Sequence, residues 1–188
     1  MEINEAVQKY ERYTYADYCS WNDEKRYELI DGIPYALAAP SRSHQKTSMQ
    51  ISSIINNYLA GKPCEVFAAP FDVRLNADTL DDTVVQPDIL VVCDESKLNE
   101  KGCIGAPDMV VEIISPSTSM RDRVLKLNRY LLAGVREYWI VDPDDMTVMV
   151  HILKNGEYVI NAYGGDDEIP VHVLKGCVIN MAEVFPIN

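Results

Sequence analysis

The sequence contains no apolar run that could cross a membrane. A transmembrane helix needs about 20 consecutive apolar residues, and no stretch of the 188-residue chain approaches that length. The N-terminus, from Met1 to Glu5, is acidic and lacks the apolar segment of a signal peptide. We therefore expect a cytoplasmic protein with no membrane partner.

Cysteine and histidine motifs are also missing. The five cysteines are scattered and form no Cys-x-x-Cys pair, which disfavours zinc ribbons and redox motifs. The three histidines, His44, His151 and His172, do not form a credible zinc triad. We expect the cysteines to be reduced thiols.

Positive charge is scarce, and the net charge is −12. This balance argues against non-specific binding of nucleic acid, because affinity for a polyanion comes largely from Lys and Arg. Residues 121–136 are the exception, since they hold five basic residues against the single acid Asp122. The five are Arg121, Arg123, Lys126, Arg129 and Arg136. This basic segment is a candidate for contacts with phosphate.

The sequence does contain two acids inside apolar stretches. Glu112 interrupts the run from Met109 to Ile114, and Asp88 opens the run that ends at Val92. Both runs are typical of buried strands, and a carboxylate is almost never fully buried unless it is paired or binds a metal. A divalent cation is the simplest explanation. The alternative is two buried acids that pair with arginines or backbone N–H groups.

The pattern along the chain predicts a mixed sheet flanked by helices. Strands joined by the turn Asp31-Gly32 form a hairpin, and Ser43 to Leu59 form a helix with Met49 on its apolar stripe. A second helix begins near Ser117 and Thr118 and ends at about Ala133, before Gly134. Its expected sheet-facing residues are Val124, Leu127 and Leu131. A strand over 137–142, a β-meander over 147–173 and a short helix over 180–185 complete one domain, 1–188.

Six blocks of this sequence closely resemble the Uma-type family of restriction endonucleases, in the PD-(D/E)XK nuclease superfamily. They are Tyr27–Gly32, Ala69–Val73, Val85–Asp88, Gly105–Asp108, Val111–Ser117 and Gly134–Pro143. The resemblance runs from about Trp21 to Phe185. It implies a restriction-endonuclease-like α/β fold with an added C-terminal β-meander, a magnesium site and DNA cleavage.

The resemblance also implies roles for particular residues. Asp88 and Glu112 are the expected metal ligands, joined by the carbonyl of Ile113, because Mg²⁺ (or Mn²⁺) prefers oxygen donors. Glu28 matches the acid that opens the superfamily core, and it supports the site. Asp88 and Glu112 should converge on adjacent strands.

The catalytic lysine of the superfamily is missing from its usual place, which is Ile114 here. A cation is needed to orient the attacking water or to stabilise the transition state. Lys126 is the expected replacement, and its ammonium should lie within about one hydrogen bond of Glu112. The alternative is a solvated lysine that pairs with Asp122. Tyr130 lies on the same helix face and either contacts a sugar or phosphate or only packs.

These inferences predict a Mg²⁺-dependent DNA endonuclease or nicking enzyme, which we expect to be a homodimer. Two rival functions remain. One is a non-catalytic nucleic-acid-binding or regulatory module with the nuclease fold, favoured by Ile114 and by the acidic charge. The other is a metal-dependent hydrolase of a smaller phosphate ester.

Overall fold

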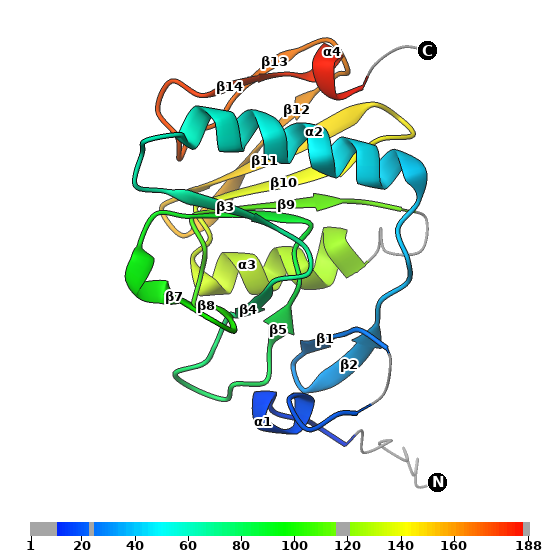
Figure 1. Cartoon of the computed structure of the whole chain (residues 1–188), viewed down its shortest axis with the longest axis vertical. Coiled ribbons are helices and arrows are strands. Elements are labelled where there is room, and N and C mark those ends of the chain that lie inside the picture. Colours follow the sequence, from blue (N-terminus) through cyan, green and yellow to red (C-terminus); the bar gives the residue numbers. More distant parts are fainter. Residues whose placement is uncertain (1–10, 23–24, 116–120, 186–188) are drawn as a thin grey trace, which may run out of the picture.

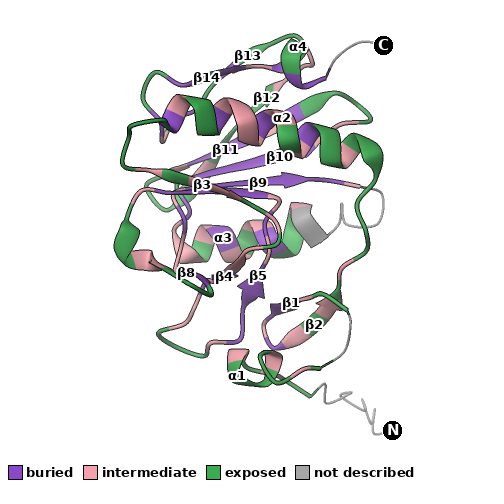
Figure 2. Ribbon diagram, in the orientation of Figure 1, coloured by how far each residue is buried: buried purple, intermediate pink, exposed green. Residues whose placement is uncertain are grey.

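A six-stranded mixed sheet forms the centre of the computed structural model, which describes residues 11–22, 25–115 and 121–185. Its strand order is β12-β11-β10-β9-β6-β3. The bounds are β3 (Glu65–Ala68), β6 (Ile89–Val92), β9 (Met109–Ile113), β10 (Glu137–Asp142), β11 (Thr147–Lys154) and β12 (Glu157–Tyr163). β9 and β10 are parallel, and the other neighbours are antiparallel. The two apolar runs form the strands β6 and β9, which are fully buried as predicted, and Figure 2 shows the burial of β9.

Helices α2 (Arg42–Leu59) and α3 (Leu127–Ala133) cover opposite faces of this sheet (Figure 1). α2 begins one residue before the predicted start, and Ser41 caps it through a bond from the N–H of His44. Its buried side includes Ile51 and Ile55, which pack on β6 and β9. The prediction for Met49 is wrong, because that side chain is exposed to solvent.

A second sheet lies on the far side of α3 (Figure 1). Its order is β2-β1-β5-β4-β8-β7, with bounds β1 (Tyr27–Ile30), β2 (Ile33–Ala36), β4 (Asp72–Arg74), β5 (Val84–Val85), β7 (Leu98–Asn99) and β8 (Gly102–Ile104). The predicted hairpin joins β1 to β2, with φ values of 53° at Asp31 and 75° at Gly32. Positive φ at both positions is the signature of a type I′ turn. This hairpin brings Glu28 beside the central sheet.

The segment before α3 departs from the prediction. Arg121–Lys126 form a π-helical turn, and α3 begins at Leu127; the predicted start at Ser117 and Thr118 lies outside the described residues. Val124 is exposed rather than packed on the sheet. The cause is the wider i→i+5 spacing of a π-helix, which removes Val124 from the face of Leu127 and Leu131. The helix ends as predicted, with Gly134 in the left-handed conformation.

The C-terminal part contains the predicted meander only as far as β12. The turn Asn155-Gly156 joins β11 to β12, but β13 (Glu168–Pro170) pairs with β14 (Val178–Asn180) in a separate sheet. The short helix α4 (Met181–Val184) follows, capped by Asn180. Two further short helices are α1 (Tyr15–Tyr18), capped by Thr14, and a 3₁₀ turn over Glu95–Lys97.

The expectation of five reduced thiols is wrong, because Cys64 and Cys93 form a disulfide. Cys64 directly precedes β3 and Cys93 directly follows β6, and the register of these strands pairs Glu65 with Val92. The next pair in that register is the two cysteines, whose Cα atoms are 4.0 Å apart. Cys19, Cys103 and Cys177 are free.

Candidate metal and active site

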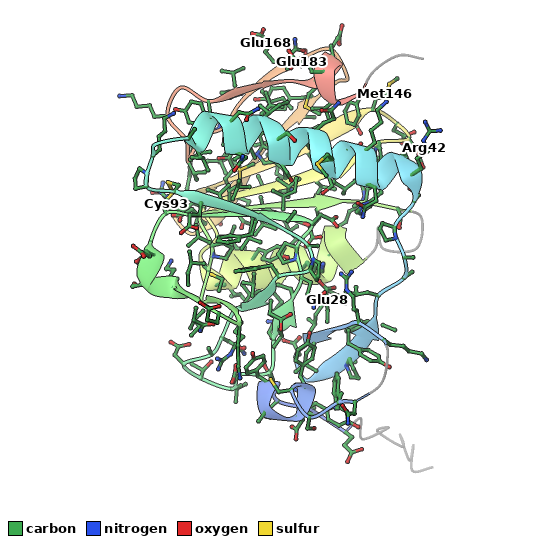
Figure 3. The ribbon with its side chains drawn as sticks, in the orientation of Figure 1. Glu28, Arg42, Cys93, Met146, Glu168 and Glu183 are labelled. Atoms are coloured by element: carbon green, nitrogen blue, oxygen red, sulfur yellow. A yellow bond between two sulfur atoms is a disulfide. The ribbon has the colours of Figure 1, made fainter. Side chains whose placement is uncertain are left out.

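The predicted site residues line one cavity of about 310 Å³, at the junction of α2, β1, β6, β9 and the turn before α3. Glu28, Asp88, Glu112, Ile113 and Lys126 all contribute to its wall. Figure 3 shows Glu28 between β1 and α3. The structure therefore brings together every residue that the sequence assigned to the site. A larger cavity, of about 600 Å³, lies on the other side of α3 and contains none of them.

Asp88 directly precedes β6, and Glu112 lies on the antiparallel neighbour β9. Ile89 pairs with Val111, so continuing the register by one residue places Asp88 opposite Glu112. The N–H of Ile113 donates to Asp88 Oδ2 at 2.7 Å. The carbonyl of Ile113 faces the same strand edge as its N–H, because a strand residue directs both groups to one neighbour. Two carboxylates and a carbonyl oxygen thus face a shared space.

Lys126 makes the contact that the sequence predicted. Its Nζ lies 2.9 Å from Glu112 Oε1 and 2.6 Å from Glu28 Oε1. The lysine side chain is only 3% exposed, and both glutamates are buried as well. Lys126 is therefore not a solvated surface lysine. It joins the hairpin strand β1 to the central strand β9 through one ammonium.

Tyr130 completes the surroundings of Glu112. It lies one helical turn after Lys126, and its hydroxyl donates to Glu112 Oε1 at 2.6 Å. Burial, and to a lesser degree the negative charges of Glu112 and Glu28, raise the pKa of Tyr130 well above 10. The phenol is therefore a neutral donor at physiological pH. The side chain is fully buried and its hydroxyl contacts Glu112, so it is not exposed to a sugar or phosphate.

The sequence leaves His44 to face phosphate or to cap the turn at the start of its helix, and it does not connect His44 with Asp88. His44 lies in the first turn of α2, and its Nε2 is 3.1 Å from Asp88 Oδ2. The sequence shows that a histidine opens this helix, but only the packing of α2 on β6 reveals that it reaches Asp88.

Gln86 holds Glu28 in the site. Its N–H donates to Glu28 Oε1 at 2.9 Å, and its side-chain amide donates to Asp72 Oδ1 at 2.9 Å. The side-chain oxygen of Gln86 accepts a bond from Arg26 Nε at 3.1 Å. A backbone donor and the Lys126 ammonium therefore converge on one oxygen of Glu28.

The donor set fits a hard divalent cation. Mg²⁺ is usually held by one or two carboxylates and keeps several waters, so Asp88, Glu112 and the Ile113 carbonyl form a sufficient protein half of such a site. Among the described residues, no group of three or more His, Cys, Asp and Glu side chains is arranged to hold a metal ion. Waters and a substrate oxygen would have to complete the coordination.

Three arginines of the basic segment are paired with acids. Arg123 lies 3.5 Å from Asp142, Arg129 lies 2.6 Å from Asp31, and Arg136 pairs with Asp108. Contacts of these arginines with phosphate stay a prediction, and any such contact competes with an acid of the same chain.

The fold and these residues define a class. A mixed sheet between helices, with Asp and Glu on adjacent strands and a lysine from the next helix, is restriction-endonuclease-like. The chain belongs to the family described as "Uma2: Putative restriction endonuclease", whose model matches residues 8–182.

Two individual proteins are similar to the chain. One is the Synechocystis sp. protein described as "Uncharacterized protein slr1290". It is 28% identical over 157 residues, and the match covers 81% of each of the two chains. The other is a crystal structure of "a putative nuclease belonging to DUF820" from Anabaena variabilis. Its TM-score is 0.76 at 22% identity, covering 92% of this chain and 97% of that one, which establishes a shared fold. In the described part of the chain, no helix is long and apolar enough to cross a membrane.

Proposed function

We propose that this protein is a metal-dependent endonuclease that hydrolyses phosphodiester bonds in DNA. The observation that carries the proposal is the buried contact of Lys126 with Glu28 and Glu112, beside Asp88. Two carboxylates contact the ammonium and a third, that of Asp88, lines the same cavity, and this excess of negative charge favours a cation. The family supports nuclease chemistry in general, whereas the metal and the substrate are our proposals.

Each residue has a distinct proposed role. Asp88, Glu112 and the Ile113 carbonyl hold Mg²⁺ or Mn²⁺, which would supply Lewis-acid stabilisation and an acidified water. Lys126 orients the attacking water or offsets charge that develops on the phosphate. Glu28 holds the Lys126 ammonium in place, Tyr130 fixes the carboxylate of Glu112, and His44 holds Asp88.

Nicking of a supercoiled plasmid in Mg²⁺ or Mn²⁺ tests the proposal. The wild-type protein should nick the plasmid, and Glu112→Gln and Asp88→Asn should reduce the rate at least 100-fold. Glu157→Gln, at an exposed position on β12, is the matched control and should retain the wild-type rate. Absence of nicking with either metal, or an active Glu112→Gln variant, would refute the proposal.

One observation favours the non-catalytic alternative. The only lysine in the described wall of the cavity is 3% exposed and is held by two glutamates, an arrangement that also suits a purely structural ion pair. A binding module would shift DNA in a gel without nicking it, and Glu112→Gln would leave that binding unchanged. A homodimer and a cytoplasmic location stay predictions; sedimentation of the purified protein tests the first.

A further inference from the structure

Three half-buried aromatic rings form a hollow of about 350 Å³ on the outer side of the β1–β2 hairpin. Its lining consists of Tyr13, Trp21, Asn22, Tyr27 and Pro34. Trp21 contacts Tyr13 and Tyr27 edge to face, with centroid distances of 5.4 and 5.3 Å. The core residues Trp139, Tyr130 and Tyr138 are fully buried, whereas these three rings keep part of their surface in solvent. The volume lies at the lower end of the range for small-ligand pockets, about 300–1,000 Å³.

The chemistry of this aromatic hollow suits a flat, polar ligand. Its rings offer faces and edges for stacking, and the exposed carboxamide of Asn22 can both donate and accept a hydrogen bond. Three exposed basic side chains are close to these rings in the sequence: Arg12 directly precedes Tyr13, and Lys25 and Arg26 directly precede Tyr27. The same segment also holds the acids Glu11, Asp17, Asp23 and Glu24, so these bases lie among acids.

Neighbouring residues of one segment line the aromatic hollow and the candidate active site. Arg26 lines the active-site cavity, and the next residue, Tyr27, lines the aromatic hollow. Trp21 also contacts the ring of Tyr18 at 5.5 Å, and the hydroxyl of Tyr18 accepts a bond from Gln86, which holds Glu28.

We propose that the aromatic hollow binds an unpaired nucleobase of the DNA strand whose phosphodiester lies in the candidate active site. This inference rests on the proposed nuclease function and narrows its substrate to DNA with unpaired nucleotides. Proteins that hold single strands combine basic side chains with aromatic rings on which bases stack. In a duplex the bases are already stacked and paired, so they cannot enter the aromatic hollow.

The position of the hairpin supports an unpaired strand over a duplex. Tyr27 and Glu28 are consecutive on β1, so their side chains point to opposite faces of the sheet. Among the described strands, β2 forms the edge of that sheet. A nucleic acid that reaches both sites must bend sharply around β2. A single strand does this readily, whereas duplex DNA stays nearly straight over about 150 base pairs.

The fluorescence of Trp21 tests this proposal without catalysis. The chain has two tryptophans, and Trp139 is fully buried, so a base stacked in the aromatic hollow quenches Trp21. The probes are a 12-nucleotide oligothymidine and a blunt duplex of 12 base pairs, titrated in EDTA. We expect saturable quenching by the single strand, with a dissociation constant at least tenfold below that for the duplex.

Variants at two tyrosines make the test specific. Tyr27→Ser removes one stacking ring and should weaken binding of the single strand about 5- to 150-fold, the range expected for one stacked base. Tyr163→Ser, on β12, is the matched control and should bind as the wild type does. Melting curves establish that both variants are folded.

Three results would overturn the proposal: no quenching by the single strand, equal affinity for the duplex, or equal losses in both variants. A protein partner for the aromatic hollow would appear as binding of the single strand that Tyr27→Ser leaves unchanged, which also overturns it. Plasmid nicking by a protein that shows no quenching would refute this inference and leave the proposed function intact. Quenching without nicking would refute the proposed nuclease function and leave binding of a base in the aromatic hollow intact.

Discussion

The ammonium of Lys126 lies 2.6 Å from Glu28 Oε1, although these residues belong to the turn before α3 and to the outer sheet. The same ammonium contacts Glu112 on the central sheet. A single side chain therefore connects the two sheets of the protein at the floor of its candidate site. This contact has consequences for stability that can be measured separately from any activity.

Lys126→Met should destabilise the protein by about 3–5 kcal/mol. The substitution keeps a long apolar stem but leaves two buried carboxylates facing each other without a cation, and breaking a buried ion pair from one side carries a cost of this size. Urea unfolding measures the change. The double variant Lys126→Met, Glu28→Gln removes one of the facing charges and should regain more than half of the loss. If Lys126→Met unfolds at the wild-type urea concentration, the ion pair is not formed in solution.

Tyr130→Phe should cost about 1.5–3 kcal/mol, the range for a hydrogen bond to a charged group. The matched variant is Tyr158→Phe. The hydroxyl of Tyr158 donates to the neutral carbonyl of Val135 at 2.9 Å, and loss of such a hydrogen bond costs about 0.5–1.5 kcal/mol. Urea unfolding at pH 7 measures the loss of stability in both variants. Equal losses for the two variants would indicate that Glu112 is not the charged acceptor of Tyr130.

Stability should fall as the pH drops below about 6.5, and His151 should account for part of that fall. Burial lowers the pKa of His151 below 6.5 in the folded protein. As the pH decreases, His151 therefore binds a proton in the unfolded chain before it does so in the folded protein. The contribution of neutral His151 to the free energy of unfolding is complete above pH 6.5 and is lost as the pH decreases.

Unfolding midpoints between pH 7 and pH 5.5 test the role of His151. The decrease should be smaller in His151→Gln than in the wild-type protein. A decrease in His151→Gln as large as that of the wild type would contradict the assignment.

Reduction of the disulfide between Cys64 and Cys93 should destabilise the protein by about 2–4 kcal/mol, because the bond closes a loop across 29 positions of the chain. Cys64→Ser should show the same loss, and the exposed Cys19→Ser should show none. Thiol titration of the unreduced, denatured protein should give three thiols out of five. Five reactive thiols would show that the bond is absent.

The sequence predicted the elements whose cause is local. Asp31-Gly32 specifies a tight turn on its own, and Glu112 is conspicuous because its neighbours on both sides are apolar. Asp88 and Glu112 were expected to converge on adjacent strands; β6 and β9 are neighbours, Asp88 lies just before β6, and the approach of the two carboxylates stays a prediction. Lys126 was assigned to the site only through the family resemblance, because its spacing alone favours a surface lysine that pairs with Asp122.

The features that the sequence did not predict depend on contacts between distant segments. The pairing of Cys64 with Cys93 requires the register of β3 with β6, which no spacing reveals. His44 reaches Asp88 only because α2 packs on the central sheet. Val124 was placed inward because the α-helical period was assumed to extend through Lys126, where the structure has a π-helical turn.

Anomalous diffraction from crystals grown with Mn²⁺ tests the central claim most directly. The account predicts one peak within about 2.0–2.6 Å of carboxylate oxygens from both Asp88 and Glu112, in the range for hard cations bound to oxygen. The Ile113 carbonyl should lie at a similar distance, and the peak should vanish in Glu112→Gln. A fully occupied Mn²⁺ elsewhere, with none between Asp88 and Glu112, would contradict the account.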